Sequence, residues 1–281
     1  MDSRQIQLVI SDIDGTILND HHLVDDQLKD TLLALHKKAI PFILASARSP
    51  KGMVPITEEL NITDNPIVCY NGALVLKKQK SGHYTSLFSH ELDREEVRLI
   101  VDVINSQFPE VAINLYSGSE WYVAKNDKWT KMEAVITNEQ PIERNLQLLL
   151  LDFKLPVHKL LLIGESEEIN QLLEYFKHLN LKNSSFYLSK NNYMEITHRE
   201  VSKDKALIEL SKYYDVPLEN TMAIGDNFND IPMLSLAGLG IVMDNAPEEV
   251  KKSTKIKTTD NNNYGVSNAL RKFIIDSRLS N

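Results

Sequence analysis

The sequence lacks several features that would place it in a specialised class of protein. It holds a single cysteine, Cys69, among 281 residues, so no disulfide can form within the chain. No apolar run approaches the roughly 20 residues that a membrane-spanning helix needs, and the run Leu148 to Leu151 is far too short. These absences exclude a disulfide-stapled scaffold and make a reducing cytoplasm the expected location.

Positive charge is also in deficit. Thirty-one Lys and Arg residues face thirty-nine Asp and Glu residues, which gives a net charge of −8. That balance disfavours nucleic acid or an anionic membrane as the main partner. A small anionic molecule remains a possible partner, because a local site can be positive on an acidic protein. Nothing in the sequence indicates an oligomeric state.

What is present is a composition typical of globular proteins, with 42% hydrophobic and 25% charged residues. The length suits one large α/β domain or two domains. In the first third, short apolar runs alternate with amphipathic segments. The helix expected over residues 25–39 places Leu28, Leu32, Leu35 and Ala39 on one face. We expect strands at 6–10 and 41–45, a helix at 49–60, and a short buried strand at 66–70 that makes Cys69 an inert core thiol.

The last third repeats this rhythm, whereas the middle does not. Helices are expected at 202–214, 229–237 and 264–276, and strands at 221–225 and 238–243. In the middle we expect antiparallel strand pairs around helices, with helices at 93–107 and 167–179 and strands at 111–116, 120–124, 159–163, 185–189 and 193–197. The pattern predicts an α/β fold, a Rossmann-like, doubly wound parallel sheet with an inserted α+β domain. The predicted ranges are 1–81 and 198–281 for the core and 82–197 for the insertion.

Two acidic residues, Asp12 and Asp14, follow the first apolar strand and precede Gly15-Thr16. Residues two apart in an extended segment point the same way, so both carboxylates could reach one site. Two carboxylates at the end of a buried strand repel each other unless a cation or a shared proton neutralises them. Read alone, the segment is equally compatible with a solvated turn. An EF-hand calcium loop is excluded, because Ile17 and Leu23 stand where Gly and Glu are required.

A second acidic segment, Gly225-Asp226-Asn227-Phe228-Asn229-Asp230, follows the strand expected at 221–225. Glycine lets the backbone approach a ligand closely, and carboxylate and amide oxygens are the ligands that magnesium prefers. An Asx-rich turn is the alternative for this segment alone. Two acidic strand ends in one α/β chain favour a shared site, since ligands bind outside the carboxyl ends of such strands.

Two further segments supply donors that suit a phosphoryl group. Ser46 lies at the end of the second expected strand, and Lys203 lies at the start of a helix. A phosphoryl group binds a hydroxyl, a cation and backbone N–H groups. Each residue alone is more typical of ordinary surface structure.

Together these four segments resemble the motifs of the haloacid dehalogenase superfamily of phosphatases, in the same order along the chain. The insertion resembles the type-IIB cap of the Cof-like subfamily. Secondary matches are Tyr70-Asn71-Gly72-Ala73, Met194-Glu195-Ile196 and Asn245-Ala246. The chain departs from the family at three positions that commonly hold glycine, namely Ala47, Asp204 and Asp244. The two added acids could lower turnover or shift substrate preference.

The resemblance implies a mechanism and a set of site residues. Asp12 is the expected nucleophile that forms an aspartyl-phosphate, and Asp14 is the expected general acid and base. Mg²⁺ is expected on the Asp12 carboxylate, the Asp14 backbone carbonyl and the Asp226 carboxylate. Ser46, Ala47 and Lys203 are expected to bind the phosphate. Asn229 and Asp230 are expected to orient the metal waters and Lys203.

The expected activity is therefore Mg²⁺-dependent hydrolysis of small phosphate monoesters, such as sugar phosphates or phosphorylated cofactors. Two alternatives stay open. A phosphomutase or other phosphotransferase with a related cap would share these motifs, and a catalytically silent magnesium-binding regulatory module would share the fold. The physiological substrate is not readable from the sequence.

Overall fold

The computed structural model describes residues 5–276 and divides the chain into two compact units. The first unit contains the residues up to Ala47, Met53–Leu87 and the residues from Ser202 onward. The second contains Arg48–Gly52 and Phe88–Val201. The chain thus leaves the first unit and returns to it, as in an inserted domain. The main segment of the second unit begins at residue 88, and the chain returns to the first unit at residue 202. Both boundaries lie a few residues after the predicted ones at 82 and 198.

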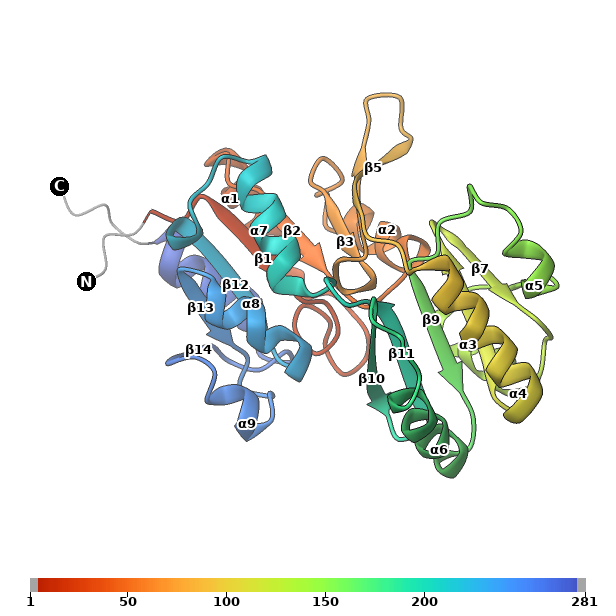
Figure 1. Ribbon diagram of the computed structural model, residues 1–281. Helices are drawn as coiled ribbons and strands as arrows, with labels where there is room; N and C mark the ends of the chain where they lie inside the picture. The colour runs from red at the N-terminus through yellow and green to blue at the C-terminus, as the bar shows by residue number, and fades with distance from the viewer. Residues whose placement is uncertain (1–4, 277–281) are drawn as a thin grey trace. The chain divides into compact units, whose positions relative to one another are not determined.

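An eight-stranded sheet forms the centre of the first unit, with strand order β14-β13-β12-β1-β2-β3-β4-β5 (Figure 1). β1 pairs in parallel with both β2 and β12, and parallel pairing continues from β12 to β14 and from β2 to β3. β4 pairs antiparallel with β3. The strands are β1 Leu8–Ser11, β2 Phe42–Ala45, β3 Ile67–Cys69, β4 Leu74–Lys78, β5 Tyr84–Ser89, β12 Thr221–Gly225, β13 Leu239–Val242 and β14 Ile256–Lys257.

The helices of this unit are α1 Asp26–Lys37, α2 Pro50–Glu59, α7 Lys203–Tyr213, α8 Ile231–Leu236, α9 Glu248–Lys251 and α10 Gly265–Leu270. Except for the short α9, which was not predicted, they overlap the ranges that the sequence predicts. In α1 the predicted burial of Leu28, Leu32 and Leu35 is confirmed, and each such leucine contributes about 1.5–3 kcal/mol. The prediction for Ala39 is wrong. That residue lies beyond the end of α1 at a φ of 55°, where it is exposed.

The second unit contains a six-stranded sheet of order β10-β11-β9-β6-β7-β8. Its pairs are antiparallel except for β7 with β8, which agrees with the predicted α+β character. The strands are β6 Ala112–Ser117, β7 Glu120–Val123, β8 Ile142–Glu143, β9 Lys159–Ile163, β10 Ser184–Lys190 and β11 Tyr193–His198, and the helices are α3 Arg94–Gln107, α4 Lys128–Thr137, α5 Leu146–Leu149 and α6 Ser166–Lys177.

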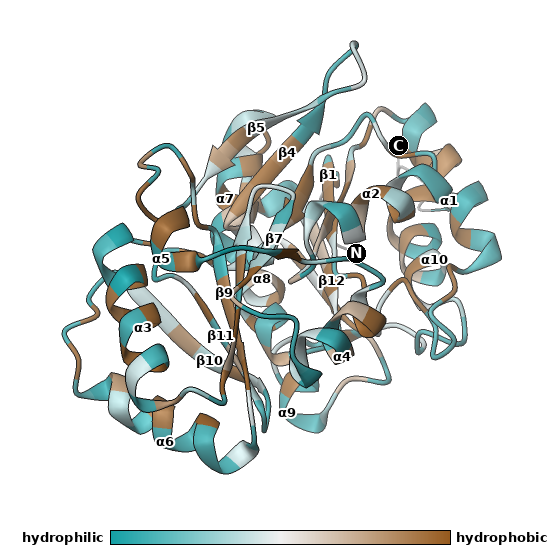
Figure 2. Cartoon of the chain, turned by 90° about the vertical axis from the view of Figure 1, so that its right-hand side faces the viewer, coloured by the Kyte–Doolittle hydropathy of each residue, from teal (hydrophilic) through white to brown (hydrophobic). Residues whose placement is uncertain are grey.

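The core of the second unit follows from the alternation of side chains along its strands. Leu160 and Leu162 of β9 lie in one apolar cluster with Val97 and Ile100 of α3 and Leu172 of α6. Figure 2 shows hydrophobic colouring along β9 and β11, while α3 and α6 are hydrophobic on part of their surface and hydrophilic elsewhere. Amphipathic helices therefore cover one face of this sheet.

Two further expectations can be compared with the structure. Cys69 is fully buried in β3, so the prediction of a core cysteine is confirmed. Within residues 5–276, no helix has the length and apolarity that crossing a membrane would require.

Candidate active site

The predicted site residues follow the carboxyl ends of neighbouring strands in the first unit. Ser11, the last residue of β1, is in register with Leu44 of β2 and Ile224 of β12. The next residue, Asp12, donates its backbone N–H to the Ile224 carbonyl at 2.9 Å. Parallel pairing therefore brings the ends of these three strands to the same edge of the sheet.

Asp12 and Asp14 occupy different environments, although they are only two residues apart. The Asp12 side chain is buried, whereas Asp14 is exposed and forms an isolated bridge with Leu18. Between them Ile13 is fully buried, and its carbonyl accepts hydrogen bonds from the N–H groups of Thr16 and Ile17. The turn thus fixes Asp12 inside the site and leaves Asp14 in contact with solvent.

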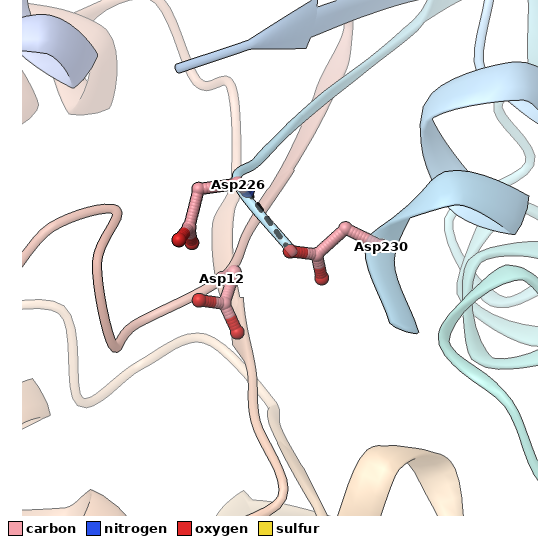
Figure 3. A group of neighbouring side chains, drawn as sticks. All are labelled: Asp12, Asp226 and Asp230. Atoms are coloured by element: carbon pink, nitrogen blue, oxygen red, sulfur yellow. Dashed lines mark hydrogen bonds between the residues drawn. The ribbon is translucent and has the colours of Figure 1, made fainter. Parts of the chain in front are cut away.

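Lys203 connects Asp12 with Asp230. Its ammonium group, fully buried at the first residue of α7, contacts Oδ1 of Asp12 and lies 2.7 Å from Oδ1 of Asp230. Oδ2 of Asp230 accepts hydrogen bonds from the backbone N–H groups of Asp226 (3.0 Å) and Asn227 (2.9 Å). Figure 3 shows the first of these bonds and the three carboxylates around one centre. Asp230 is therefore held by both the lysine and the backbone that follows β12.

Asp226 is positioned by the turn after β1. The Thr16 hydroxyl donates to Oδ1 of Asp226 at 2.7 Å, and the Asn245 amide, which donates to the Gly15 carbonyl at 2.8 Å, lies 3.5 Å from Oδ2. Gly15 has a φ of +79°, and a Cβ at this residue would collide with the Asp226 carboxylate. The glycine therefore permits both the left-handed turn and the close approach of the carboxylate.

The charges of this cluster are unbalanced. Burial raises the pKa of Asp12 well above its ordinary value; Lys203 opposes the rise, and Asp230 and Asp226 add to it. Burial is likewise the main cause that raises the pKa of Asp226 to about 6. Burial alone would lower the pKa of Lys203, but Asp12 and Asp230 outweigh it and hold that pKa above its ordinary value. Three carboxylates thus share one ammonium group.

A metal ion would fit this excess of negative charge. Asp12, Asp226 and Asp230 each offer a carboxylate oxygen, and these atoms lie within 4.8 Å of one another. Hard divalent cations prefer such oxygen ligands. Because Asp230 already accepts bonds from Lys203 and two backbone N–H groups, Asp12 and Asp226 are the carboxylates better suited to hold the ion.

The remaining predicted residues lie at the same strand ends. Ser46 is buried directly after β2, its N–H donates to the Val68 carbonyl at 2.9 Å, and Ala47 beside it is half-buried. Asn229 lies in the short 3₁₀ turn Phe228–Asp230. Of the two added acids, Asp204 is half-buried in the first turn of α7, and Asp244 is exposed and lies 3.7 Å from Lys251.

Sequence reasoning gave Thr16 only a part in shaping its loop and gave no role to Asn245 or Asn71, although all three contact site residues. Thr16 and Asn245 face the Asp226 carboxylate, and Asn71 accepts a hydrogen bond from Asn229 at 3.1 Å. Their partners are 210, 19 and 158 positions away in the chain, so no local pattern reveals these contacts. The only available signal was their place in segments with a family resemblance.

Comparison with known proteins gives consistent similarities. The haloacid dehalogenase-like hydrolase family matches residues 9–270. A Haemophilus influenzae protein with a provisional phosphatase name is 31% identical over 266 residues, which cover 92% of this chain and 95% of that protein. A haloacid dehalogenase-like hydrolase from Bacteroides thetaiotaomicron has a TM-score of 0.86 at 26% identity and covers 96% of this chain and 100% of its own. A subclass IIB sugar phosphatase shares the fold, with a TM-score of 0.78 at 21% identity and coverage of 95% and 98%.

Proposed function

We propose that this chain, which belongs to the haloacid dehalogenase-like hydrolases and is a phosphoric monoester hydrolase, cleaves small phosphate esters with Mg²⁺ through a phosphorylated Asp12. The observation that carries this proposal is the buried cluster of Asp12, Asp226 and Asp230, in which the Lys203 ammonium group contacts Asp12 and Asp230. A purely structural cluster would be expected to balance its charges, because unpaired buried charge is costly. An excess of carboxylates at strand ends instead suits a cation and a phosphate group.

In this proposal the chain holds Mg²⁺ with the carboxylates of Asp12 and Asp226 and the backbone carbonyl of Asp14. The ion supplies positive charge, which reduces the repulsion between an anionic nucleophile and an anionic phosphate. Thr16 and the narrow space beside Gly15 fix the Asp226 carboxylate for this task. Asp230 stays with Lys203, and Asn229 beside it would orient water bound to the ion.

Hydrolysis then takes two steps on the side chains of Asp12 and Asp14. An Asp12 oxygen attacks phosphorus and forms an O–P bond as the ester P–O bond breaks, while Asp14 gives a proton to the departing oxygen. Water next attacks the phosphorylated Asp12, Asp14 takes up the water's proton, and inorganic phosphate is released with Asp12 restored. The exposed position of Asp14 suits exchange of that proton with solvent.

The remaining residues bind the group being transferred. Lys203, the Ser46 hydroxyl and the N–H of Ala47 are proposed to contact the phosphoryl oxygens, on which negative charge concentrates during transfer. Small esters such as sugar phosphates or phosphorylated cofactors are the proposed substrates.

A steady-state screen of the purified protein would test the proposal. The panel would contain sugar phosphates, pyridoxal phosphate, flavin mononucleotide and p-nitrophenyl phosphate, each with Mg²⁺ and with EDTA. We expect Mg²⁺-dependent phosphate release that falls about 10⁴-fold in Asp12→Asn. Near-normal hydrolysis by Asp12→Asn would refute the nucleophile. Absence of Mg²⁺-stimulated hydrolysis of every ester would favour the silent module, and an isomerised sugar phosphate would indicate a phosphotransferase.

A further inference from the structure

The segment Tyr70–Gly72 has an unusual backbone conformation next to the proposed site. Tyr70, Asn71 and Gly72 follow β3 directly and have φ values of 52°, 58° and 114°. Left-handed φ is unfavourable for a tyrosine and tolerable for asparagine and glycine. Three such residues in succession require that the surrounding structure hold the turn in place.

The backbone of this turn fixes the position of Ser46. The N–H of Asn71 donates to the Ser46 carbonyl at 2.8 Å, while the N–H of Ser46 donates to Val68 of β3 at 2.9 Å. Ser46 is thus held on both sides of its α-carbon, through its N–H and through its carbonyl. A change in the backbone conformation of this turn would shift the first of these bonds.

The side chain of Asn71 fixes Asn229. Its Oδ1 accepts a hydrogen bond from the Asn229 amide at 3.1 Å, and the Asn71 side chain is 93% buried. Because the NH₂ group of the Asn229 side chain is engaged in this bond, the side-chain oxygen Oδ1 of Asn229 points in a defined direction. Asn229 immediately precedes Asp230, the partner of Lys203.

The third residue of the turn packs against the start of α7. A Cβ at Gly72 would lie 2.9 Å from the carbonyl oxygen of Ser202 and 3.4 Å from Cβ of Ala206. Ser202 is the residue before Lys203. The turn therefore contacts three site segments, those of Ser46, Asn229 and Lys203.

We propose that Asn71 is a positioning residue of the active site, with separate tasks for its side chain and its backbone. The side chain orients Asn229 toward the waters of the bound Mg²⁺, and the left-handed backbone places Ser46 for the phosphate. The inference rests on the proposed function for the identity of the two ligands. It follows from the geometry of a turn that has no part in the chemistry itself.

Two substitutions separate these tasks. Asn71→Gly keeps the left-handed backbone, and hence the bond to Ser46, but removes the contact with Asn229. Asn71→Ala removes the contact and also disfavours the backbone conformation. Asn71→Asp keeps an acceptor for Asn229 and serves as the conservative rescue. Asn61→Gly is the matched control, because exposed Asn61 has a φ of 55° and follows α2.

Binding of Mg²⁺ and of inorganic phosphate would be measured by calorimetry, the latter at saturating Mg²⁺. We expect Asn71→Gly to weaken Mg²⁺ binding about tenfold with phosphate binding within twofold of wild type. Asn71→Ala should weaken both about tenfold. Asn71→Asp should bind Mg²⁺ within threefold of wild type, and Asn61→Gly should change neither affinity. Circular dichroism would confirm that each variant folds.

The inference is overturned if Asn71→Gly binds Mg²⁺ as tightly as the wild type does. It is also overturned if Asn61→Gly weakens Mg²⁺ binding as much as Asn71→Gly does. Failure of the proposed function would look different. A protein that hydrolyses no phosphate ester, yet loses Mg²⁺ affinity in Asn71→Gly, would refute the enzyme mechanism and support the positioning role.

Discussion

Lys203 in the first unit and Lys159 in the second are both buried, but they differ in their partners. Lys203 contacts Asp12 and Asp230, with Asp226 beside them. Lys159 forms an ion pair with Glu195 at 2.9 Å, in which each side chain is 8% exposed. The first cluster has an excess of acid, whereas the second pairs one base with one acid.

The Lys159–Glu195 pair is completed by a neutral hydroxyl. The Tyr187 hydroxyl donates to Glu195 at 2.7 Å, and although burial alone would raise the pKa of Glu195, Lys159 and this hydroxyl outweigh it and lower that pKa. Burial raises the pKa of nearby Glu133 above its ordinary value. The comparison indicates that a balanced buried pair serves structure, whereas an unbalanced one is suited to an external cation. Two predictions test that distinction, and two more test other contacts, one in each unit.

The largest effect is expected from removing each lysine in turn. Lys203→Met should lower kcat/KM for p-nitrophenyl phosphate by about 10³–10⁴-fold, because it removes the ammonium group that is proposed to contact the phosphoryl oxygens. Lys159→Met should leave kcat/KM within a few-fold while lowering stability. Steady-state kinetics and urea unfolding of both variants would check this. Equal kinetic losses in the two variants would remove the distinction.

Neutralising an acid should have opposite effects on stability in the two clusters. Glu195→Gln leaves Lys159 buried without its partner charge and should lower the free energy of unfolding by about 3 kcal/mol. Asp12→Asn relieves repulsion and should raise the melting temperature in Mg²⁺-free buffer, while abolishing the further rise that Mg²⁺ produces in the wild type. Calorimetric melting with and without Mg²⁺ measures both effects. A fall in the melting temperature of Asp12→Asn would contradict the imbalance.

The close approach at Gly15 gives a third test. Gly15→Ala introduces a Cβ that collides with the Asp226 carboxylate, so Mg²⁺-dependent kcat/KM should fall about 10²–10³-fold. Gly82→Ala is the matched control, because Gly82 has a φ of +87° and its Cβ would meet nothing within 4 Å. It should cost about 1 kcal/mol of stability and leave kinetics unchanged. Equal kinetic losses would show that backbone strain, not the carboxylate contact, is responsible.

Acid should disturb the second unit through a buried histidine. The N–H of Gly118 donates to Nδ1 of His158 at 3.0 Å, so the proton of the neutral ring lies on Nε2, 3.1 Å from the Ser89 hydroxyl. Burial lowers the pKa of His158 to about 4, with His90 adding to the shift. The unfolded chain therefore binds a proton below pH 6.5 that the folded protein excludes until about pH 4.

Stability should consequently fall by about 2–3 kcal/mol as the pH drops from 6.5 to 4, and no further through this group at lower pH. Urea unfolding at several pH values would measure the loss. His158→Gln should flatten this dependence, whereas the exposed His36→Gln should retain it. An unchanged slope in His158→Gln would contradict the assignment.

Much of the first unit was predictable because local patterns and chain topology agree. Continuous apolar runs such as residues 6–10 predict buried parallel strands, and parallel strands bring their carboxyl ends together. Asp12 and Asp226 could therefore be assigned to one site from sequence. The contacts of Thr16, Asn71 and Asn245 could not, because they depend on loop conformations and partners distant in the chain.

The elements that were missed have weak or misleading patterns. In α4 the apolar residues Val135 and Ile136 are 83% and 56% exposed, while Thr130 and Glu133 are buried. The hydrophobic periodicity of α4 therefore does not follow its burial, and no helix was expected there. β8 has two residues and α5 four, too few for any periodicity. The antiparallel pairing of β4 with β3 was also not anticipated, since the rhythm of this region suggested parallel strands only.

The position of β1 between β2 and β12 has a consequence for synthesis on the ribosome. β2 emerges soon after β1, but β12 emerges about 200 residues later, which at 5–20 residues per second is a delay of about 10–40 s. Throughout that interval the nascent chain carries an apolar strand with one edge unpaired, and the whole inserted unit is made before β12 emerges. Holdase chaperones would therefore be expected to bind the emerging N-terminal third, and the last strands made close the sheet around the first one.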